Sequence, residues 1–151
     1  MADKFFDLEQ AEKLLPQLQR WLEIATGARK ELAEIEQEYA RMVEDISLLG
    51  GRMIDVPHFS RRKQEKKQWI SRLQNTARKI EDSGCLLKDL EAGLVDFPCQ
   101  VDGREVYLCW KSGEPSIQFW HNTDEGFAGR KPVDGKLLEQ LKHRRPSEEP
   151  N

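Results

Sequence analysis

The chain has 151 residues, of which 38% are hydrophobic and 34% are charged, with a formal net charge of −3. Such a length is typical of one domain, and the high charge is typical of long helices that expose much of their surface. An acidic chain lacks the basic excess of most nucleic-acid-binding domains, so we do not expect nucleic acid as a partner. No apolar run approaches the roughly 20 residues of a membrane span, so we expect no membrane partner.

The cysteines indicate a reducing compartment. Cys85, Cys99 and Cys109 are an odd number and form no CxxC pair, so we expect free thiols. The first residues also lack the apolar core of a signal peptide. We therefore expect a cytoplasmic protein.

The first predicted element is a long helix. Asp7 and Gln10 have the spacing of a capping box at its beginning, and Gly50-Gly51 marks its end. Apolar residues recur at alternating steps of three and four, which is the heptad pattern of a coiled coil. These residues are Ala25, Ala28, Leu32, Ile35, Tyr39, Met42, Ile46 and Leu49.

A second helix is predicted between its cap at Ser60 and its end at Gly93, with Gly84 inside its apolar seam. Its seam consists of Ile70, Leu73, Ala77, Ile80, Gly84 and Leu87. Two heptad helices joined by a short loop pack most simply side by side and antiparallel. Residues 5–92 therefore predict a long two-helix coiled-coil hairpin.

After Gly93 the apolar period changes from about 3.5 to 2, which indicates strands. Asp102-Gly103 is a hairpin turn, and residues 112–115 are predicted to form the next turn. The result is a three-stranded antiparallel β-meander and loop over residues 93–132.

The whole chain is thus predicted to be an α+β protein. A single domain covers residues 1–144, and its last part, residues 133–144, is predicted to be a short helix. Residues 145–151 are predicted to be a disordered tail.

The turns also predict which residues face each other. The first hairpin places Asp96 opposite Cys109, and the second places Val106 opposite His121. On this register His121 lies on the opposite face of the sheet from Asp96 and Cys109, and a slip of one residue would reverse that result. Both faces are partly apolar, so the face that the helices leave uncovered needs a partner subunit or a ligand.

His121 and Glu114 are the candidate metal ligands. A histidine at a strand end, with a carboxylate in the preceding turn, is able to bind a divalent transition metal or act as a general base. The alternative is a structural hydrogen bond between the histidine and a carboxylate.

Arg130, Trp110 and Trp120 are candidate ligand-binding residues. Arg130 lies in a loop with Gly126 and Gly129, where it would bind a phosphate or carboxylate, or pair with a nearby acidic side chain. The two tryptophans would stack on a planar ligand or pack in the core.

Residues 61–67 are a basic run at the start of the second predicted helix. The run would bind RNA or an acidic partner, or form a solvated helix face. We favour the solvated face because the chain as a whole is acidic.

The C-terminal block resembles an uncharacterised bacterial family, the domain of unknown function 2203. The similarity is carried by several short motifs of the C-terminal block and by the opening residues 5–11 and 14–16. The motifs of the block are Lys88-Asp89-Leu90, Gly93 to Pro98, Leu108-Cys109-Trp110, Gly113-Glu114-Pro115, Trp120-His121 and Gly126 to Arg130. The resemblance implies a small cytoplasmic protein of bacteria or archaea. It implies no reaction.

Two functions are consistent with these features. The first is a non-enzymatic oligomerising or protein-interaction module, which predicts a homo-oligomer. The second is a metal- or small-anion-binding protein, which would include enzymes, with a site near Glu114, His121 and Arg130 and a divalent transition metal as cofactor.

Overall fold

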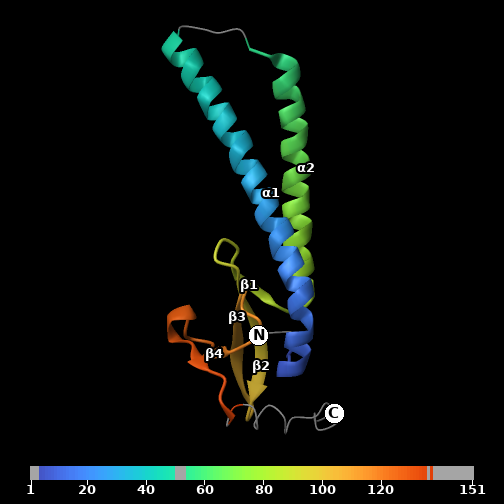
Figure 1. The fold of residues 1–151 in the computed structure, drawn as a ribbon, viewed down its shortest axis with the longest axis vertical. Helices are drawn as coiled ribbons and strands as arrows, with labels where there is room; N and C mark the ends of the chain where they lie inside the picture. The colour runs from blue at the N-terminus through green and yellow to red at the C-terminus, as the bar shows by residue number, and fades with distance from the viewer. Residues whose placement is uncertain (1–3, 50–53, 136, 138–151) are drawn as a thin grey trace. The chain divides into compact units, whose positions relative to one another are not determined.

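The computed structural model describes residues 4–49, 54–135 and 137, and these fall into two compact units. We call residues 23–78 the helical unit, and residues 1–22 with 79–151 the sheet unit. Two helices are followed by a five-stranded antiparallel sheet (Figure 1), so the α+β class is confirmed. No described helix is both long and apolar enough to cross a membrane.

Helix α1 (Leu8–Leu49) begins where the capping box predicted. The backbone N–H of Gln10 donates to Asp7 Oδ1 at 2.7 Å, and the N–H of Asp7 donates to Gln10 Oε1 at 3.1 Å. In the helical unit, the seam residues Ala25, Ala28 and Ile35 are fully buried. This part of the heptad pattern therefore marks a buried stripe of α1.

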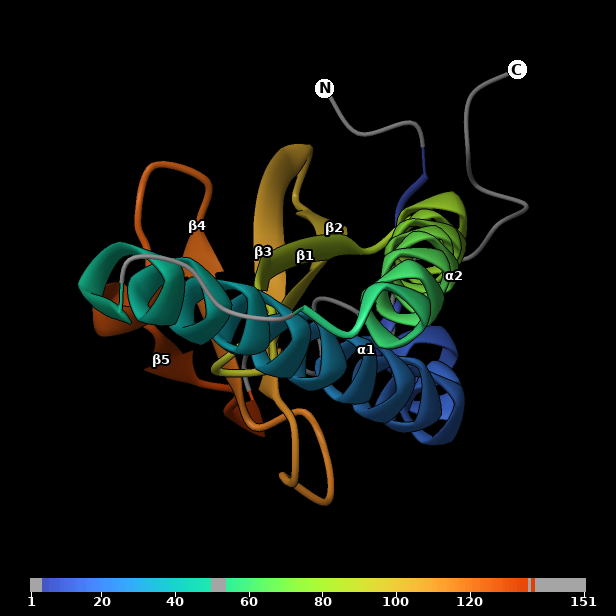
Figure 2. The same ribbon diagram turned by 90° about the horizontal axis from the view of Figure 1, so that it is seen from above.

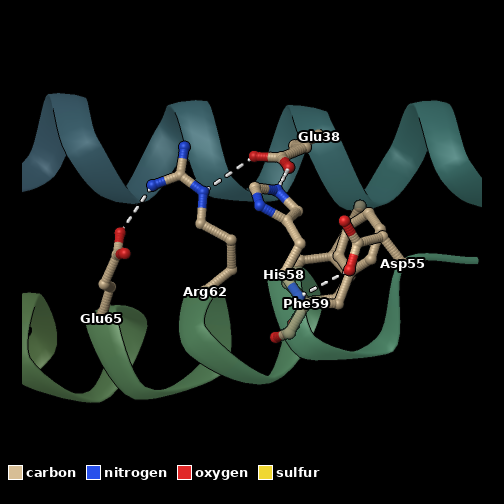
Figure 3. Close-up of polar contacts among 7 residues, drawn as sticks. Glu38, Asp55, His58, Phe59, Arg62 and Glu65 are labelled. Atoms are coloured by element: carbon tan, nitrogen blue, oxygen red, sulfur yellow. Dashed lines mark hydrogen bonds and ion pairs between the residues drawn. The ribbon is translucent and has the colours of Figure 1, made fainter.

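Helix α2 (Val56–Asp82) is joined to α1 by polar contacts within the helical unit (Figure 3). Glu38 of α1 pairs with His58, and its Oε2 accepts from Arg62 Nε at 2.8 Å. The Tyr39 hydroxyl donates to the Phe59 carbonyl at 3.2 Å. Arg62, from the basic run, is thus engaged in ion pairs.

Helix α2 ends at Asp82, well before the predicted end at Gly93. Gly84 adopts φ +98°, a left-handed conformation that stops a helix and that favours glycine. Its N–H donates to the Glu81 carbonyl at 3.0 Å, which closes the last turn. Gly84 therefore terminates the helix, and the prediction that it lies inside the apolar seam of α2 was wrong.

The prediction of a three-stranded meander was wrong, because the sheet has five strands in the order β1-β2-β3-β4-β5. An additional strand lies at each edge of the predicted three. The strands are β1 (Leu86–Asp89), β2 (Leu94–Val101), β3 (Arg104–Lys111), β4 (Phe119–Asn122) and β5 (Lys131–Pro132). Figures 1 and 2 show β2 and β3 side by side.

One face of the sheet forms the core of the sheet unit. Val95, Phe97, Val106 and Leu108 are fully buried there, and they belong to one apolar cluster with Leu18 of α1. The Phe6 and Phe97 rings pack edge to face, with ring centroids 5.3 Å apart. The predicted short helix over residues 133–144 and the predicted tail over 145–151 lie largely outside the described residues.

Candidate functional site

The site forms on the second face of the sheet, and a one-residue difference in register creates it. The pairing of β2 with β3 is as predicted, with Asp96 opposite Cys109. The pairing of β3 with β4 is shifted, so that His121 lies opposite Tyr107 and not opposite Val106. Because side chains alternate between faces, the shift moves His121 to the face of Asp96 and Cys109.

The prediction that His121 faces away from these two residues was therefore wrong. Residues 112–118 form a longer connection than the predicted four-residue turn. The backbone N–H of Lys111 donates to Glu114 Oε1 at 2.7 Å, and the N–H of Glu114 donates to the Lys111 carbonyl at 3.0 Å. This local turn ends β3, and β4 begins at Phe119.

Asp96, Cys109 and His121 form a buried cluster of three possible metal ligands. Their ligand atoms all lie within 4.8 Å of one another. Asp96 and His121 are each 3% exposed, and Cys109 is 2% exposed. His121 Nε2 lies 3.1 Å from Asp96 Oδ2, a carboxylate that the predicted register placed on the opposite face of the sheet.

The orientation of the imidazole is fixed from its other side. His121 Nδ1 lies 2.8 Å from the carbonyl oxygen of Asn122, which can only accept, so Nδ1–H donates there. In the neutral imidazole, Nε2 then carries a lone pair that faces the Asp96 carboxyl group. Two acceptors at this distance need a proton or another cation between them.

The surroundings of Asp96 and Cys109 disfavour the ionised forms of both side chains. Burial raises the pKa of Asp96 above its ordinary value, although the charge of His121 acts in the other direction. Burial and the nearby Asp96 raise the pKa of the Cys109 thiol to about 11, against the lowering effect of Arg130. A bound cation would reverse these preferences, because it favours the thiolate and the carboxylate.

A cavity of about 180 Å³ opens onto the cluster. All three cluster residues line it, together with Lys88 of β1, Tyr107 of β3 and other residues that include Phe127. The Tyr107 and His121 rings meet edge to face, with centroids 5.5 Å apart. The cluster is thus buried in the sheet yet borders a space that a small molecule can enter.

Glu114 and Arg130 pair with each other beside this cluster. Glu114 Oε1 lies 3.6 Å from Arg130 Nη1, and the Arg130 guanidinium stacks on Phe119 and Phe127 at 3.9 and 4.1 Å from their ring centroids. Among the described residues, the metal-ligand cluster contains His121 but not Glu114. Arg130 is connected to the cluster through the Cys109 thiol, with which it interacts.

Neither predicted tryptophan lines the cavity. Trp110 is 1% exposed in the core, and its Nε1–H donates to the Glu114 carbonyl at 2.9 Å. Trp120 packs against the core from the face opposite His121, with Lys131 Nζ 4.9 Å from its ring centroid. The aromatic side chains of the cavity are instead those of Tyr107 and Phe127.

The comparisons with known proteins point to a family without an assigned activity. No curated protein matches the chain. No solved structure matches it either. A family model described as "Uncharacterized conserved protein (DUF2203)" matches residues 4–133, which confirms the family resemblance, and the chain therefore belongs to this family.

Proposed function

We propose that the sheet unit binds a divalent transition-metal ion through Asp96, Cys109 and His121. Imidazole, thiolate and carboxylate are ligands that zinc takes in proteins. Bonds of about 2.0–2.3 Å in a tetrahedral site place neighbouring donors roughly 3.3–3.8 Å apart. The three ligand atoms lie within 4.8 Å of one another, so small side-chain rotations would suffice.

The observation that carries this proposal is the orientation of His121. Its Nδ1–H donates to the backbone carbonyl of Asn122, and its Nε2 points at the Asp96 carboxyl group. Metal-binding histidines are typically held in this way, by a hydrogen bond from the ring nitrogen that does not bind the metal. A metal ion would occupy the space that a proton must otherwise fill between the nitrogen and the oxygen.

The proposed site would have one open coordination position. Three protein ligands leave a fourth position for water or a substrate, which is the arrangement of catalytic and not of structural zinc sites. The adjoining cavity provides the access that such a position requires. A metal ion there would polarise a bound oxygen or lower the pKa of a bound water molecule, which is the chemistry of hydrolases and lyases.

Metal analysis and titration calorimetry of the full chain with Zn²⁺ test the proposal. We expect about one zinc ion per chain, and a loss of zinc affinity of at least about a hundredfold in Cys109→Ser and in His121→Ala, because loss of an outer-shell partner alone costs about 10–100-fold. Cys99→Ser is the matched control, because Cys99 is an equally buried thiol of β2 that is not in the cluster. The proposal would be contradicted if the wild-type protein bound no zinc, or if Cys99→Ser bound zinc as weakly as Cys109→Ser.

A second proposal concerns the helical unit, which we propose pairs as a coiled coil and joins a second copy of the chain. Its support is a set of exposed apolar side chains: Val43 is 58% exposed, Leu48 is 74% exposed and Val56 is 68% exposed. Such side chains gain free energy when a partner covers them. Light scattering at micromolar concentration should give the mass of a dimer, and Val43→Glu combined with Val56→Glu should give that of a monomer. A monomeric wild-type protein would contradict this proposal.

A further inference from the structure

Apolar and aromatic side chains contribute to the lining of the cavity beside the proposed metal site. Leu94, Tyr107 and Phe127 are among the lining residues, and Phe127 is 41% exposed. A ring or short alkyl group placed against these side chains would bury apolar surface on both partners. The volume of about 180 Å³ suits a small molecule.

The charges around the cavity favour an anion. Lys88 lines the cavity, and its Nζ lies 5.4 Å from the Tyr107 ring centroid. Glu125 also lines the cavity, but Lys131 Nζ lies 2.5 Å from its Oε1, so its charge is compensated. Lys88 is exposed, and its charge lowers the pKa of Asp96, so it acts on the metal-ligand cluster. A divalent ion bound to one thiolate and one carboxylate would form a neutral centre, and the Lys88 ammonium could then pair with an anionic ligand of that ion.

We propose that the open metal position takes a small organic anion, a carboxylate or phosphonate-type acid, whose acidic group binds the metal and faces Lys88. Its apolar part lies against Phe127 and Leu94. This inference rests on the metal site proposed above. It adds the chemical class of the ligand and two residues, Lys88 and Phe127, that select it.

The test uses the full chain loaded with Co²⁺, whose visible absorption reports the metal and its coordination. Benzoate and phenylphosphonate are titrated as probes, and acetate is the matched probe without a ring. We expect both aromatic probes to change the cobalt spectrum, and acetate to bind about fivefold more weakly than benzoate, because it buries less apolar surface. A change with only one of the two aromatic probes still supports the anion site and identifies its acid group.

Variants of the cavity residues assign the contacts. Lys88→Gln should weaken the binding of both aromatic probes about five- to tenfold, which is the effect expected for loss of a charged hydrogen-bond partner. Phe127→Ala should weaken the binding of benzoate and leave the binding of acetate unchanged. Lys79→Gln is the control, because Lys79 is an exposed lysine of α2 outside the cavity.

The two proposals fail in different ways. If the chain binds no Co²⁺, the result contradicts the proposed metal site and with it the proposed anion site. If Co²⁺ binds but no probe changes its spectrum, or Lys88→Gln binds the probes as tightly as wild type, the anion site alone is overturned.

Discussion

At the scale of single residues, the Cys109 thiol shows how strongly the fold controls chemistry. Its pKa is raised to about 11 from an ordinary value of 9.0, first by burial and then by the nearby Asp96. A thiol reacts with alkylating agents as the thiolate, so a raised pKa makes it inert at neutral pH. Unfolding exposes the thiol, removes the cause and restores the ordinary reactivity.

Alkylation by iodoacetamide, mapped by mass spectrometry, checks this property. In the metal-free folded chain, modification of Cys109 should rise only as the pH approaches about 11, whereas in urea it should follow the ordinary value of 9.0. The folded thiol keeps its proton to higher pH than the unfolded thiol, so the free energy of unfolding falls as the pH rises between these two values. Equal rates at pH 8 in the folded and the urea-unfolded chain would contradict the prediction.

Glu125 gives the opposite pH dependence. Hydrogen bonds from Lys131 and Asn122 lower its pKa to about 2 from an ordinary value of 4.5. Between these values the unfolded chain binds more protons, so the contribution of Glu125 to stability is present above about 4.5 and is lost as the pH falls toward about 2. In Glu125→Gln the free energy of unfolding, measured with urea, should fall less steeply between pH 4.5 and about 2 than in wild type. An unchanged slope in this range would contradict the prediction.

At the scale of the elements, Gly93 is a position where the backbone requires glycine. It connects β1 to β2 with φ +71°, and a Cβ atom there would lie 2.5 Å from the Ser112 Cβ. Gly93→Ala should therefore lower the free energy of unfolding by roughly 2–4 kcal/mol, from backbone strain and overlap together.

Gly103→Ala is the matched control for this prediction. Gly103 has a similar φ of +78°, but a Cβ there would have no atom within 4 Å. The loss should be about 1–2 kcal/mol, which is the backbone term alone. Urea unfolding of both variants measures the difference, and equal losses would show that the contact with Ser112 carries no cost.

The same elements show what sequence patterns can predict. The register of β2 on β3 follows from the Asp102-Gly103 turn, since a two-residue loop leaves one pairing. The register of β3 on β4 cannot be derived from the sequence in the same way. Residues 112–118 contain a turn that the Glu114 side chain caps, and no local sequence pattern defines the length of this connection. The end of α2 was readable in principle, since Ser83-Gly84 is a typical helix stop, but the heptad pattern continued through it.

At the scale of the whole molecule, the α+β class was predictable because changes of apolar period mark the passage from helix to strand. The two edge strands could not be predicted in this way, because β1 has four residues and β5 has two, which are too few to show a period. The candidate site depends on residues from β2, β3 and β4. All three residue types were visible in the sequence, yet the single shifted pairing decided whether they meet.

A metal ion bound to three strands should stabilise the sheet unit as a whole. An ion present at a hundredfold excess over its dissociation constant adds about 2.7 kcal/mol to the folded state, which for a chain of about this size raises the melting temperature by about 5–10 °C. Tryptophan fluorescence is a suitable probe, because Trp21 lies with Trp110 and Trp120 in the sheet unit and only Trp69 lies in the helical unit. With Zn²⁺ the transition should move upward in wild type and in Cys99→Ser, and EDTA should reverse the shift. In Cys109→Ser zinc should shift the melting temperature by about 1 °C or less. A shift equal to that of wild type would mean that the ion binds elsewhere on the chain.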